Sequence, residues 1–257
     1  AGWSGCHWET VCVTDGVTVY RARLPPTLCI AGRILGGAAK FDCIKAAGVL
    51  DAPPAEVFEL FIDNARAGEY NEFCRELRDV EFIDNATKVT WSASGRVGPF
   101  KERDFVTRVH YRSLPDGTLL VVNRAEDAPL TAASSDRYLR MEMYLGGSVL
   151  RPLPGNPNRT IYTTLAHVNP GGVAETRIGA MLMNAAAASG PVKLVQRLRE
   201  CLRISRQAQR PDDDDEAESD SEEAEFRRLL RQLAPKLPAE GESADPPPAP
   251  ITPPAPA

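Results

Sequence analysis

Four segments of the sequence alternate between apolar and polar side chains, and this pattern constrains the fold more than any other feature. They are KVTWSASGRV (88–97), RDFVTRVHYR (103–112), YLRMEMYLGG (138–147) and TIYTTLAHV (160–168). A period of two residues is typical of β-strands with one buried face, and such strands form antiparallel sheets. Turn residues separate the segments at 114–117 (LPDG) and 153–158 (LPGNPN). The sequence therefore predicts one curved antiparallel sheet.

The first part of the chain adds strands and two helices to this sheet. HWETVCVTDGVTVYRAR (7–23) has β-branched runs around a DG turn, which indicates a hairpin, and FDCIKAAGVL (41–50) is typical of a third strand. A helix is predicted over DAPPAEVFELFID (51–63), with Asp51 as candidate N-cap and prolines in the first turn. EYNEFCRELR (69–78) is predicted to form a second short helix. Both helices follow the first three strands.

A long C-terminal helix completes the predicted fold. GAMLMNAAAASGPVKLVQRLREC (179–201) must cover the apolar face of the sheet, because no other apolar element remains to do so. Its first half is rich in alanine, and such small side chains cannot fill a deep concavity. Ser189, Gly190 and Pro191 then interrupt the helix. The predicted fold class is α+β, with a curved antiparallel sheet around this helix and a cavity between them.

The composition separates a body from a tail. Residues 1–210 carry 26 Lys and Arg against 22 Asp and Glu, and residues 211–257 carry 4 against 13, so the net charges are +4 and −9. The acidic and Pro-rich tail buries too little apolar surface to fold. We therefore expect a folded domain over 1–208 and a disordered tail over 209–257. Residues 222–233 form a candidate protein-binding helix, whose apolar face consists of Phe226, Leu229, Leu230 and Leu233.

Several classes of function are disfavoured by the sequence. The small basic excess of the body does not suit nucleic-acid binding, and no apolar stretch reaches the roughly 18 residues that span a membrane. Six cysteines without metal-ligand spacing indicate reduced thiols in an intracellular protein. We find no Ser-His-acid set and no phosphate-binding glycine loop, and we predict no enzyme, no cofactor and no metal site. We expect a cytoplasmic monomer that is peripheral to membranes, and the missing initial Met leaves room for an upstream targeting segment.

The body resembles the START domain, the lipid-transfer domain related to the steroidogenic acute regulatory protein. GVLDAPPAEVFELFID (48–63) is similar to that family's strand-to-helix segment, and residues 103–106 match its Arg-Asp-Phe-Val signature. LRMEMYLGGSVLRPL (139–153) matches the Arg-x-Glu strand of the family. HVNPGG (167–172) and GPVKLVQRLREC (190–201) match its later motifs. These five motifs occur in the family's order from Trp8 to Leu202.

The resemblance implies a helix-grip fold with a hydrophobic tunnel that binds one lipid. The chain is then expected to transfer this lipid between membranes, through transient membrane contact, or to sense it. A phospholipid or sphingolipid is favoured over a sterol, because the buried arginine of the sterol-binding branch falls on Val109 here. Two alternatives stay open: a helix-grip enzyme of the cyclase or hydrolase type, and a ligand-sensing adaptor that acts through the tail.

The predicted inward faces of the strands and the Ala-rich helix supply the candidate lipid contacts. The strands contribute Trp91, Phe105, Val109, Met141, Met143, Ile161, Leu165 and His167, and the helix contributes Met181, Ala185, Ala188 and Val192. His167 is either a contact for a lipid headgroup or a core histidine with a satisfied ring, and the second interpretation is favoured. Arg103 and Asp104 are either a headgroup pair or a structural ion pair at a strand end, and the ion pair is favoured.

We also predict that residues 179–192 form a lid that opens for the lipid. A buried lipid cannot enter a close-packed protein unless some element moves. Gly179, Gly190 and Pro191 supply the weak points of this helix. The loop 113–120 resembles the family's gate loop, and it offers Leu114 and Leu119 as apolar contacts with the membrane or the helix.

Overall fold

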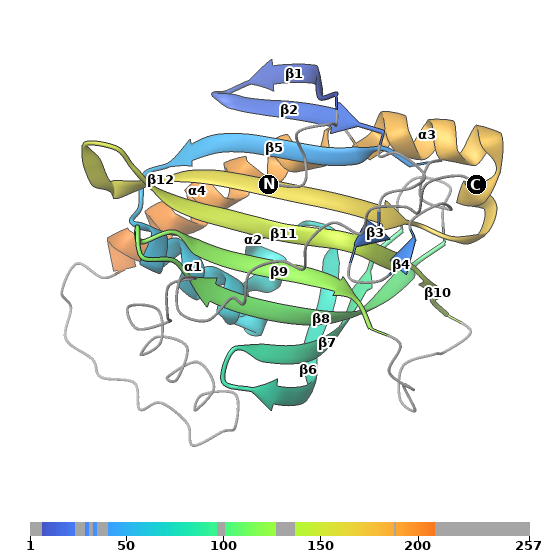
Figure 1. Ribbon diagram of the computed structural model, residues 1–257, viewed down its shortest axis with the longest axis horizontal. Coiled ribbons are helices and arrows are strands. Elements are labelled where there is room, and N and C mark those ends of the chain that lie inside the picture. Colours follow the sequence, from blue (N-terminus) through green and yellow to red (C-terminus); the bar gives the residue numbers. More distant parts are fainter. Residues whose placement is uncertain are drawn as a thin grey trace, which may run out of the picture.

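One large sheet bends around the helices of this protein (Figure 1). The computed structural model describes residues 7–23, 29–30, 33–34, 41–96, 101–126, 137–187 and 189–208. The strands lie in the order β1-β2-β5-β12-β11-β9-β8-β7-β6, all antiparallel, and β10 pairs in parallel with β8. Their bounds are β1 (Glu9–Thr14), β2 (Val17–Ala22), β5 (Cys43–Leu50), β6 (Cys74–Asp84), β7 (Thr87–Ser94), β8 (Arg103–Ser113), β9 (Leu119–Ala125), β10 (Leu139–Arg140), β11 (Glu142–Leu153) and β12 (Asn156–Asn169). A separate small sheet pairs β3 (Cys29–Ile30) with β4 (Arg33–Ile34).

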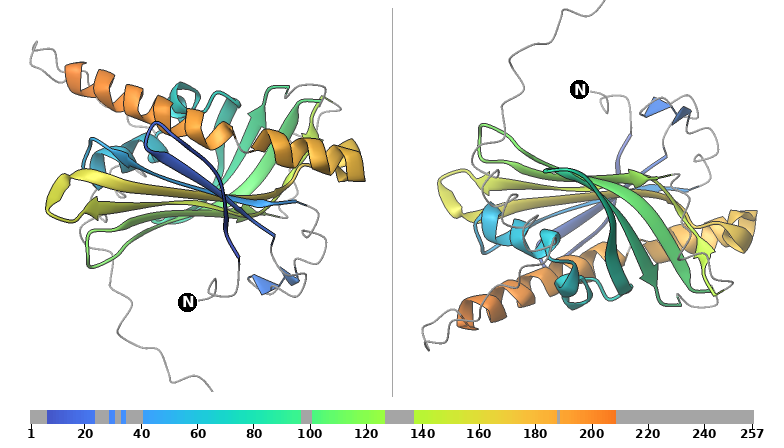
Figure 2. Two further views of the ribbon diagram at one scale, coloured as in Figure 1. Left: turned by 90° about the horizontal axis from the view of Figure 1, so that it is seen from above. Right: turned by 90° about the horizontal axis from the view of Figure 1, so that it is seen from below.

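The helices α1, α2 and α4 lie on one side of the large sheet (Figure 2). Their order along the chain is α1 (Pro54–Ile62), η2 (Asn64–Arg66), α2 (Ala67–Tyr70), η3 (Gly172–Glu175), α3 (Arg177–Ala187) and α4 (Gly190–Ala208). The predicted curved antiparallel sheet with a C-terminal helix, and with two helices after its first three strands, is confirmed. The C-terminal helix is divided where the sequence predicted an interruption. Gly190 and Pro191 begin α4. A proline is tolerated in the first turn, because the backbone N–H groups there have no acceptor within the helix.

The second short helix was predicted too long, and this prediction over 69–78 is wrong. The helix α2 ends at Tyr70, and β6 starts at Cys74. Tyr70, Phe73, Cys74 and Leu77 have helical spacing, but from Cys74 onward the backbone pairs with β7 through an antiparallel ladder with three register shifts. These long-range hydrogen bonds override the local pattern. The first helix also begins later than predicted, after Pro53 and not after Asp51.

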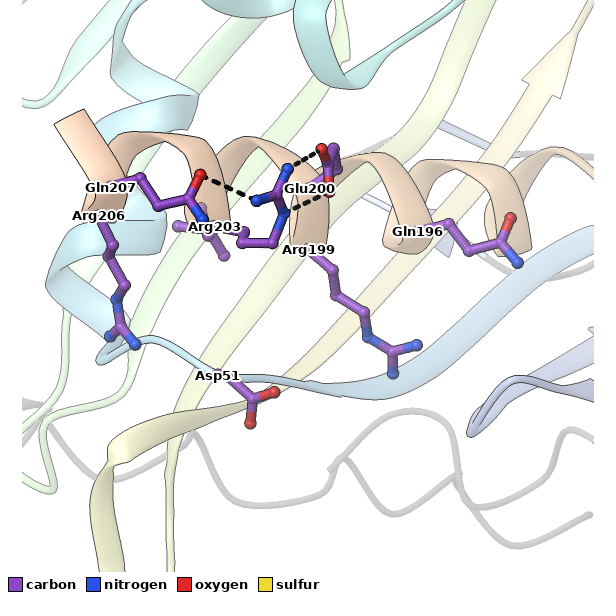
Figure 3. Close-up of a pocket in the computed structure, with 8 residues that line it drawn as sticks. Asp51, Gln196, Arg199, Glu200, Arg203, Arg206 and Gln207 are labelled. Carbon is purple, nitrogen blue, oxygen red and sulfur yellow. Dashed lines mark hydrogen bonds and ion pairs between the residues drawn. The ribbon is translucent and has the colours of Figure 1, made fainter.

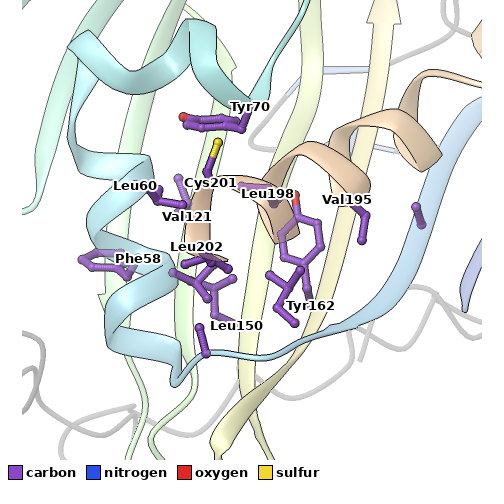
Figure 4. Packing of buried hydrophobic residues seen from close by; sticks show 14 of the residues in the cluster. Phe58, Leu60, Tyr70, Val121, Leu150, Tyr162, Val195, Leu198, Cys201 and Leu202 are labelled. Carbon is purple, nitrogen blue, oxygen red and sulfur yellow. The ribbon is translucent and has the colours of Figure 1, made fainter. Parts of the chain in front are cut away.

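The main core lies where α4 and α1 pack on the concave face of the sheet. Figure 4 shows side chains of both helices meeting Leu150, Tyr162 and their neighbours on the strands. Leu198 and Val195 of α4 are fully buried in this cluster. Gly48 on β5 faces this helix, and a Cβ atom there would be in van der Waals contact with Val195 at 3.4 Å. The long C-terminal helix is therefore clamped to one half of the sheet.

Candidate functional site

A cavity of about 450 Å³ occupies the other half of the concave face, between the sheet and the α1–α2 segment. Helical and connecting residues form one wall, and strands from β6 to β12 form the other. The lining residues are Phe61, Asn64, Ala67, Tyr70, Asn71, Phe73, Cys74, Leu77, Thr90, Ser92, Ala93, Ser94, Arg103, Phe105, Thr107, Val109, Tyr111, Val121, Asn123, Met141, Met143, Ala166 and Val168. Apolar and aromatic side chains predominate, with a minority of hydroxyl and amide groups, as in most small-molecule sites.

The polar groups of the cavity come mostly from the inward face of β7 and β8. Thr90 and Thr107 stand opposite each other, and their hydroxyl oxygens lie 3.0 Å apart in a hydrogen bond. Ser92 and Ser94 continue the same face of β7 toward its end. Asn123 on β9 lies beside Gly146, where any larger side chain would collide with Asn123 and Met143. The glycine thus leaves room for both side chains at the cavity wall.

Arg103 is the only charged residue in the described cavity lining, and its side chain is held by the backbone. Arg103 is buried, with 3% of its surface exposed. Its Nε donates to the carbonyl oxygen of Pro170 at 3.1 Å, and its Nη1 donates to that of Lys101 at 2.5 Å. Burial lowers the pKa of Arg103 from its ordinary value, because the charged form loses hydration. The guanidinium still carries a positive charge at neutral pH.

A buried ion pair supports the helical wall of the cavity. The Nζ of Lys88 lies 2.9 Å from Oδ1 of Asp79 and donates to Oδ1 of Asn64 at 3.4 Å. It also lies 6.0 Å from the ring centre of Tyr111. Burial raises the pKa of Tyr111 well above its ordinary value, so the ring stays neutral. Asn64 and Tyr111 line the cavity, and the ion pair therefore fixes two parts of its wall.

Four of the predicted lipid contacts lie at this cavity. They are Phe105, Val109, Met141 and Met143. Their contact with a lipid stays a prediction. Sequence reasoning weighed Arg103 as a headgroup contact but favoured an ion pair with Asp104. It missed the serines and Thr90 of β7 and the helical wall. On β7 the alternation could have found the polar set, if the face with Thr90, Ser92 and Ser94 had been taken as the inward one.

The prediction that Trp91 faces the cavity is wrong. Trp91 is buried on the opposite face of β7, in a small cluster with Val89, Ala93 and Val106. Its Nε1 donates to Oδ2 of Asp104 at 2.9 Å, and its ring meets that of Tyr138 edge-on at 5.8 Å. The favoured ion pair between neighbours Arg103 and Asp104 is wrong for the same reason. Successive residues of a strand point to opposite faces, and Asp104 pairs instead with Arg140 at 2.8 Å.

The predicted inward face of β12 is also reversed. Tyr162, Ala166 and Val168 point to the concave side, so Ile161, Leu165 and His167 lie on the convex side. His167 is fully buried there, with its ring 5.3 Å from that of Tyr144. The favoured core interpretation of His167 therefore fits its position, whereas its assignment to the cavity does not. The ring of Tyr162 stacks on that of Phe61 in α1 at 6.0 Å and is buried in the main core, and this packing decides which face of the strand turns inward.

The C-terminal helices contribute little of the predicted site. Val192 belongs to the main core, and Met181 is 64% exposed on α3, so neither lines the cavity. Ala188 lies outside the described residues, and so does the side chain of Ala185. Gly179 lies in the first turn of α3, and Gly190 with Pro191 starts α4. The lid therefore stays a prediction for α3 and its junction with α4.

The predicted gate loop is at the wrong end of the sheet to meet this lid. The β8–β9 turn is closed by a hydrogen bond from the backbone N–H of Leu114 to the carbonyl of Thr118, and it borders Pro152 near the β11–β12 turn. Leu119 is buried in the main core. Figure 1 shows α3 at the opposite end of the strands. The α3–α4 junction borders Phe73 instead, through Gly190.

A second groove lies on the outer side of α4 (Figure 3), and unlike the cavity it is lined mainly by charged and amide side chains. Arg203 binds Glu200 and Gln207 within the same helix. Arg199 donates to the carbonyl oxygens of Val49 and Asp15, at 3.1 Å and 2.7 Å. Arg199 therefore fastens α4 to β5 and to the β1–β2 turn. The groove is therefore explained by attachment of the helix.

Cys74 offers a chemical probe of the cavity. Burial raises the pKa of its thiol, so little reactive thiolate forms near pH 8. We expect iodoacetamide to modify Cys74 slowly in the ligand-free chain, and more slowly still once a ligand fills the cavity. Peptide mass mapping of alkylation over time measures this. Cys12, half-buried on β1, is the internal control, and equal protection of both thiols would argue against occupancy of this cavity.

Comparison with known proteins agrees with this architecture. The sequence model of the START domain matches residues 7–208. Human StAR-related lipid transfer protein 5 superposes with a TM-score of 0.65 at 16% identity, covering 77% of this chain and 88% of that one. Human STARD10 gives a TM-score of 0.66 at 16% identity, covering 90% of this chain and 83% of that one. A STAR-related lipid transfer protein from Xanthomonas axonopodis gives 0.59 at 18% identity, covering 76% and 98%. No curated protein matches the sequence.

Proposed function

This chain belongs to the START domain family, and on that premise we propose that it binds one lipid molecule in its central cavity. In this proposal the chain transfers the lipid between membranes or senses it. The cavity itself carries the proposal: its walls are mostly apolar and aromatic, and most of its polar groups lie on β7, β8 and β9. Burying a chain of about ten CH2 groups at roughly 0.8 kcal/mol each supplies ample binding free energy.

The exposed face of α3 supports transient contact with a membrane. Ile178 is 69% exposed and Met181 is 64% exposed, one turn apart on this helix. Neighbouring apolar side chains on an exposed helix favour burial in a lipid surface. The same helix leads to the α3–α4 junction, which borders Phe73 of the cavity wall through Gly190. None of the helices in the described ranges is long and apolar enough to cross a membrane.

The proposal is tested by filling the cavity. Ala166 lines it from β12, and Ala166→Phe puts a ring into the space that the lipid is proposed to occupy. We expect lipid affinity to fall about tenfold or more, because overpacking costs roughly 1–3 kcal/mol. Fluorescent-lipid titration and native mass spectrometry of the purified protein measure this. Unchanged lipid binding in the folded variant would contradict the proposed site.

Ala47→Phe is the matched control for that variant. Ala47 lies on β5, on the convex face, opposite Thr163 of β12. The change adds the same ring to the same sheet, but outside the cavity. We expect lipid binding to be retained. A wild-type protein that carries no lipid and takes up none from vesicles would refute the proposed function itself.

Two other functions remain as alternatives to be tested. A helix-grip enzyme needs reactive groups that converge on a substrate, whereas the described lining offers hydroxyls, amides and one arginine. The candidate histidine, His167, lies on the other face of the sheet. An adaptor that acts through residues 222–233 depends on a segment outside the described residues. We favour lipid binding and transfer, because most of the residues that line the cavity are apolar or aromatic.

A further inference from the structure

We propose that the cavity selects an oxygenated lipid, in which a hydroxyl or keto group within the hydrocarbon part binds Thr90 and Thr107. The proposal rests on the proposed function and narrows it to one class of ligand. The sequence resemblance concerned phospholipids, sphingolipids and sterols, and a polar group within the hydrocarbon part is a separate requirement. Two observations carry the proposal: a buried pair of hydroxyl groups with spare hydrogen-bonding capacity, and apolar cavity walls on both sides of this pair.

The two threonines form a buried hydroxyl pair with one proton to spare. Thr90 and Thr107 are 4% and 6% exposed, and both line the cavity. Their hydroxyl oxygens lie 3.0 Å apart, and this bond uses one of the two hydroxyl protons. Among the residues that the structure describes, neither hydroxyl has a further partner, so the second proton has no acceptor there. Because a buried donor without an acceptor is costly, a ligand oxygen that accepts this proton is favoured.

Ser92 adds a third hydroxyl group to this patch. It follows Thr90 on the inward face of β7 and lines the cavity, and its hydroxyl has no hydrogen-bond partner within the described part of the chain. A hydroxyl group both donates and accepts hydrogen bonds. The three groups can therefore bind a ligand hydroxyl, which needs a donor and an acceptor, or a ketone, which needs only donors. The patch is neutral, and it suits an uncharged oxygen function.

Apolar side chains flank the hydroxyl patch on both sides along β8. Phe105 precedes Thr107 on the inward face and Val109 follows it, and all three line the cavity. Met141 follows β10, which pairs with the start of β8, and it extends the apolar wall on the Phe105 side. Val121 of β9 extends the wall on the Val109 side. A ligand that fills the cavity therefore meets the hydroxyl groups between two apolar stretches, so its oxygen belongs within the chain and not at its end.

The experiment compares two alcohols that differ only in where the hydroxyl group stands. Delipidated full-length protein is titrated into 6-undecanol, which carries the hydroxyl at mid-chain, and into 1-undecanol, which carries it at the end. Both have twelve non-hydrogen atoms, fewer than the roughly 15 groups of about 30 Å³ for which a cavity of about 450 Å³ has room. In calorimetry we expect the wild type to bind 6-undecanol about 5- to 10-fold more tightly, which is the net effect of one neutral hydrogen bond.

A double variant, Thr90→Val with Thr107→Val, removes both hydroxyl groups and keeps the shape of the side chains. Replacing both partners of a buried hydrogen bond by apolar groups of the same shape changes stability little, so we expect this variant to fold. It should bind the two isomers equally. Thr90→Ser with Thr107→Ser retains both hydroxyls and should retain the preference. Thr163→Val, on the convex face of β12, is the control for the valine change and should retain it too.

The outcomes separate this proposal from the function on which it rests. Equal binding of the two isomers by the wild type overturns the proposal and leaves lipid binding itself in place. A preference for 6-undecanol that survives in the double valine variant also overturns it, because the threonine pair would then serve only the sheet. A wild type that binds neither alcohol and takes up no lipid from vesicles refutes the proposed function, and the proposal with it.

Discussion

Replacing Asp104 by alanine is expected to lower the free energy of unfolding by about 3 kcal/mol. The carboxylate of Asp104 is buried and accepts two hydrogen bonds from Arg140, at 2.8 Å each, and one from Trp91 at 2.9 Å. Its removal leaves the indole N–H of Trp91 buried without this acceptor and separates Arg140 from its counter-charge. Breaking a fully buried pair costs roughly 3–5 kcal/mol, and the lower end applies because the Arg140 side chain is partly exposed.

The measurement is urea-induced unfolding followed by circular dichroism. Asp104→Asn keeps an acceptor for Trp91 and should lose only about 1–2 kcal/mol. Glu81→Ala removes an acid from the exposed face of β6 and should change stability by less than about 0.5 kcal/mol. A loss below about 1 kcal/mol for Asp104→Ala would show that water replaces this network at little cost.

Leu198→Ala is expected to lower the free energy of unfolding by about 2–5 kcal/mol. Leu198 is fully buried in the core where α4 meets the sheet, and its truncation removes apolar burial and leaves a cavity. For a chain of this size the corresponding fall in Tm is about 2–4 °C for each kcal/mol. Thermal unfolding by calorimetry or circular dichroism measures it.

Ile204→Ala is the matched control for Leu198→Ala. Ile204 lies on the same helix and loses as many carbon atoms, but it is 52% exposed. Its replacement should cost about 1 kcal/mol or less, because water already covers much of the side chain. Similar losses for the two variants would mean that α4 is not clamped to the sheet through Leu198. That result would also mean that α4 is not a fixed neighbour of the cavity.

Much of the architecture could be predicted from the sequence, because local patterns determine it. Alternation identified the segments that form β7, β8, β11 and β12 in the structure, and the LPGNPN turn joins β11 to β12. The strand β9, which follows the LPDG turn, was not predicted. The Gly190–Pro191 pair predicted the division of the C-terminal helix, since a helix seldom continues through these residues. The order of five short motifs indicated the family that the sequence model of the START domain matches over residues 7–208.

The site was harder to predict, because alternation defines two faces of a strand without stating which one turns inward. On β7 the apolar face, with Trp91, is buried against Tyr138 outside the cavity, whereas the polar face, with Thr90, lines it. A simple rule of apolar residues inside therefore chose the wrong face. The same holds for β12, where Tyr162 and not Ile161 points toward α4.

Residue types and their periods in the chain were sufficient for most of the elements, their order and the break before α4. The packing of distant segments decided the rest: that residues from Cys74 form a strand on β7, that Arg103 faces the cavity, and that Asp104 faces Arg140. The physical reason is the distance along the chain over which each effect acts. Turn and strand preferences act over a few neighbouring residues, whereas burial and counter-charge depend on which segments meet after the sheet has closed around α4.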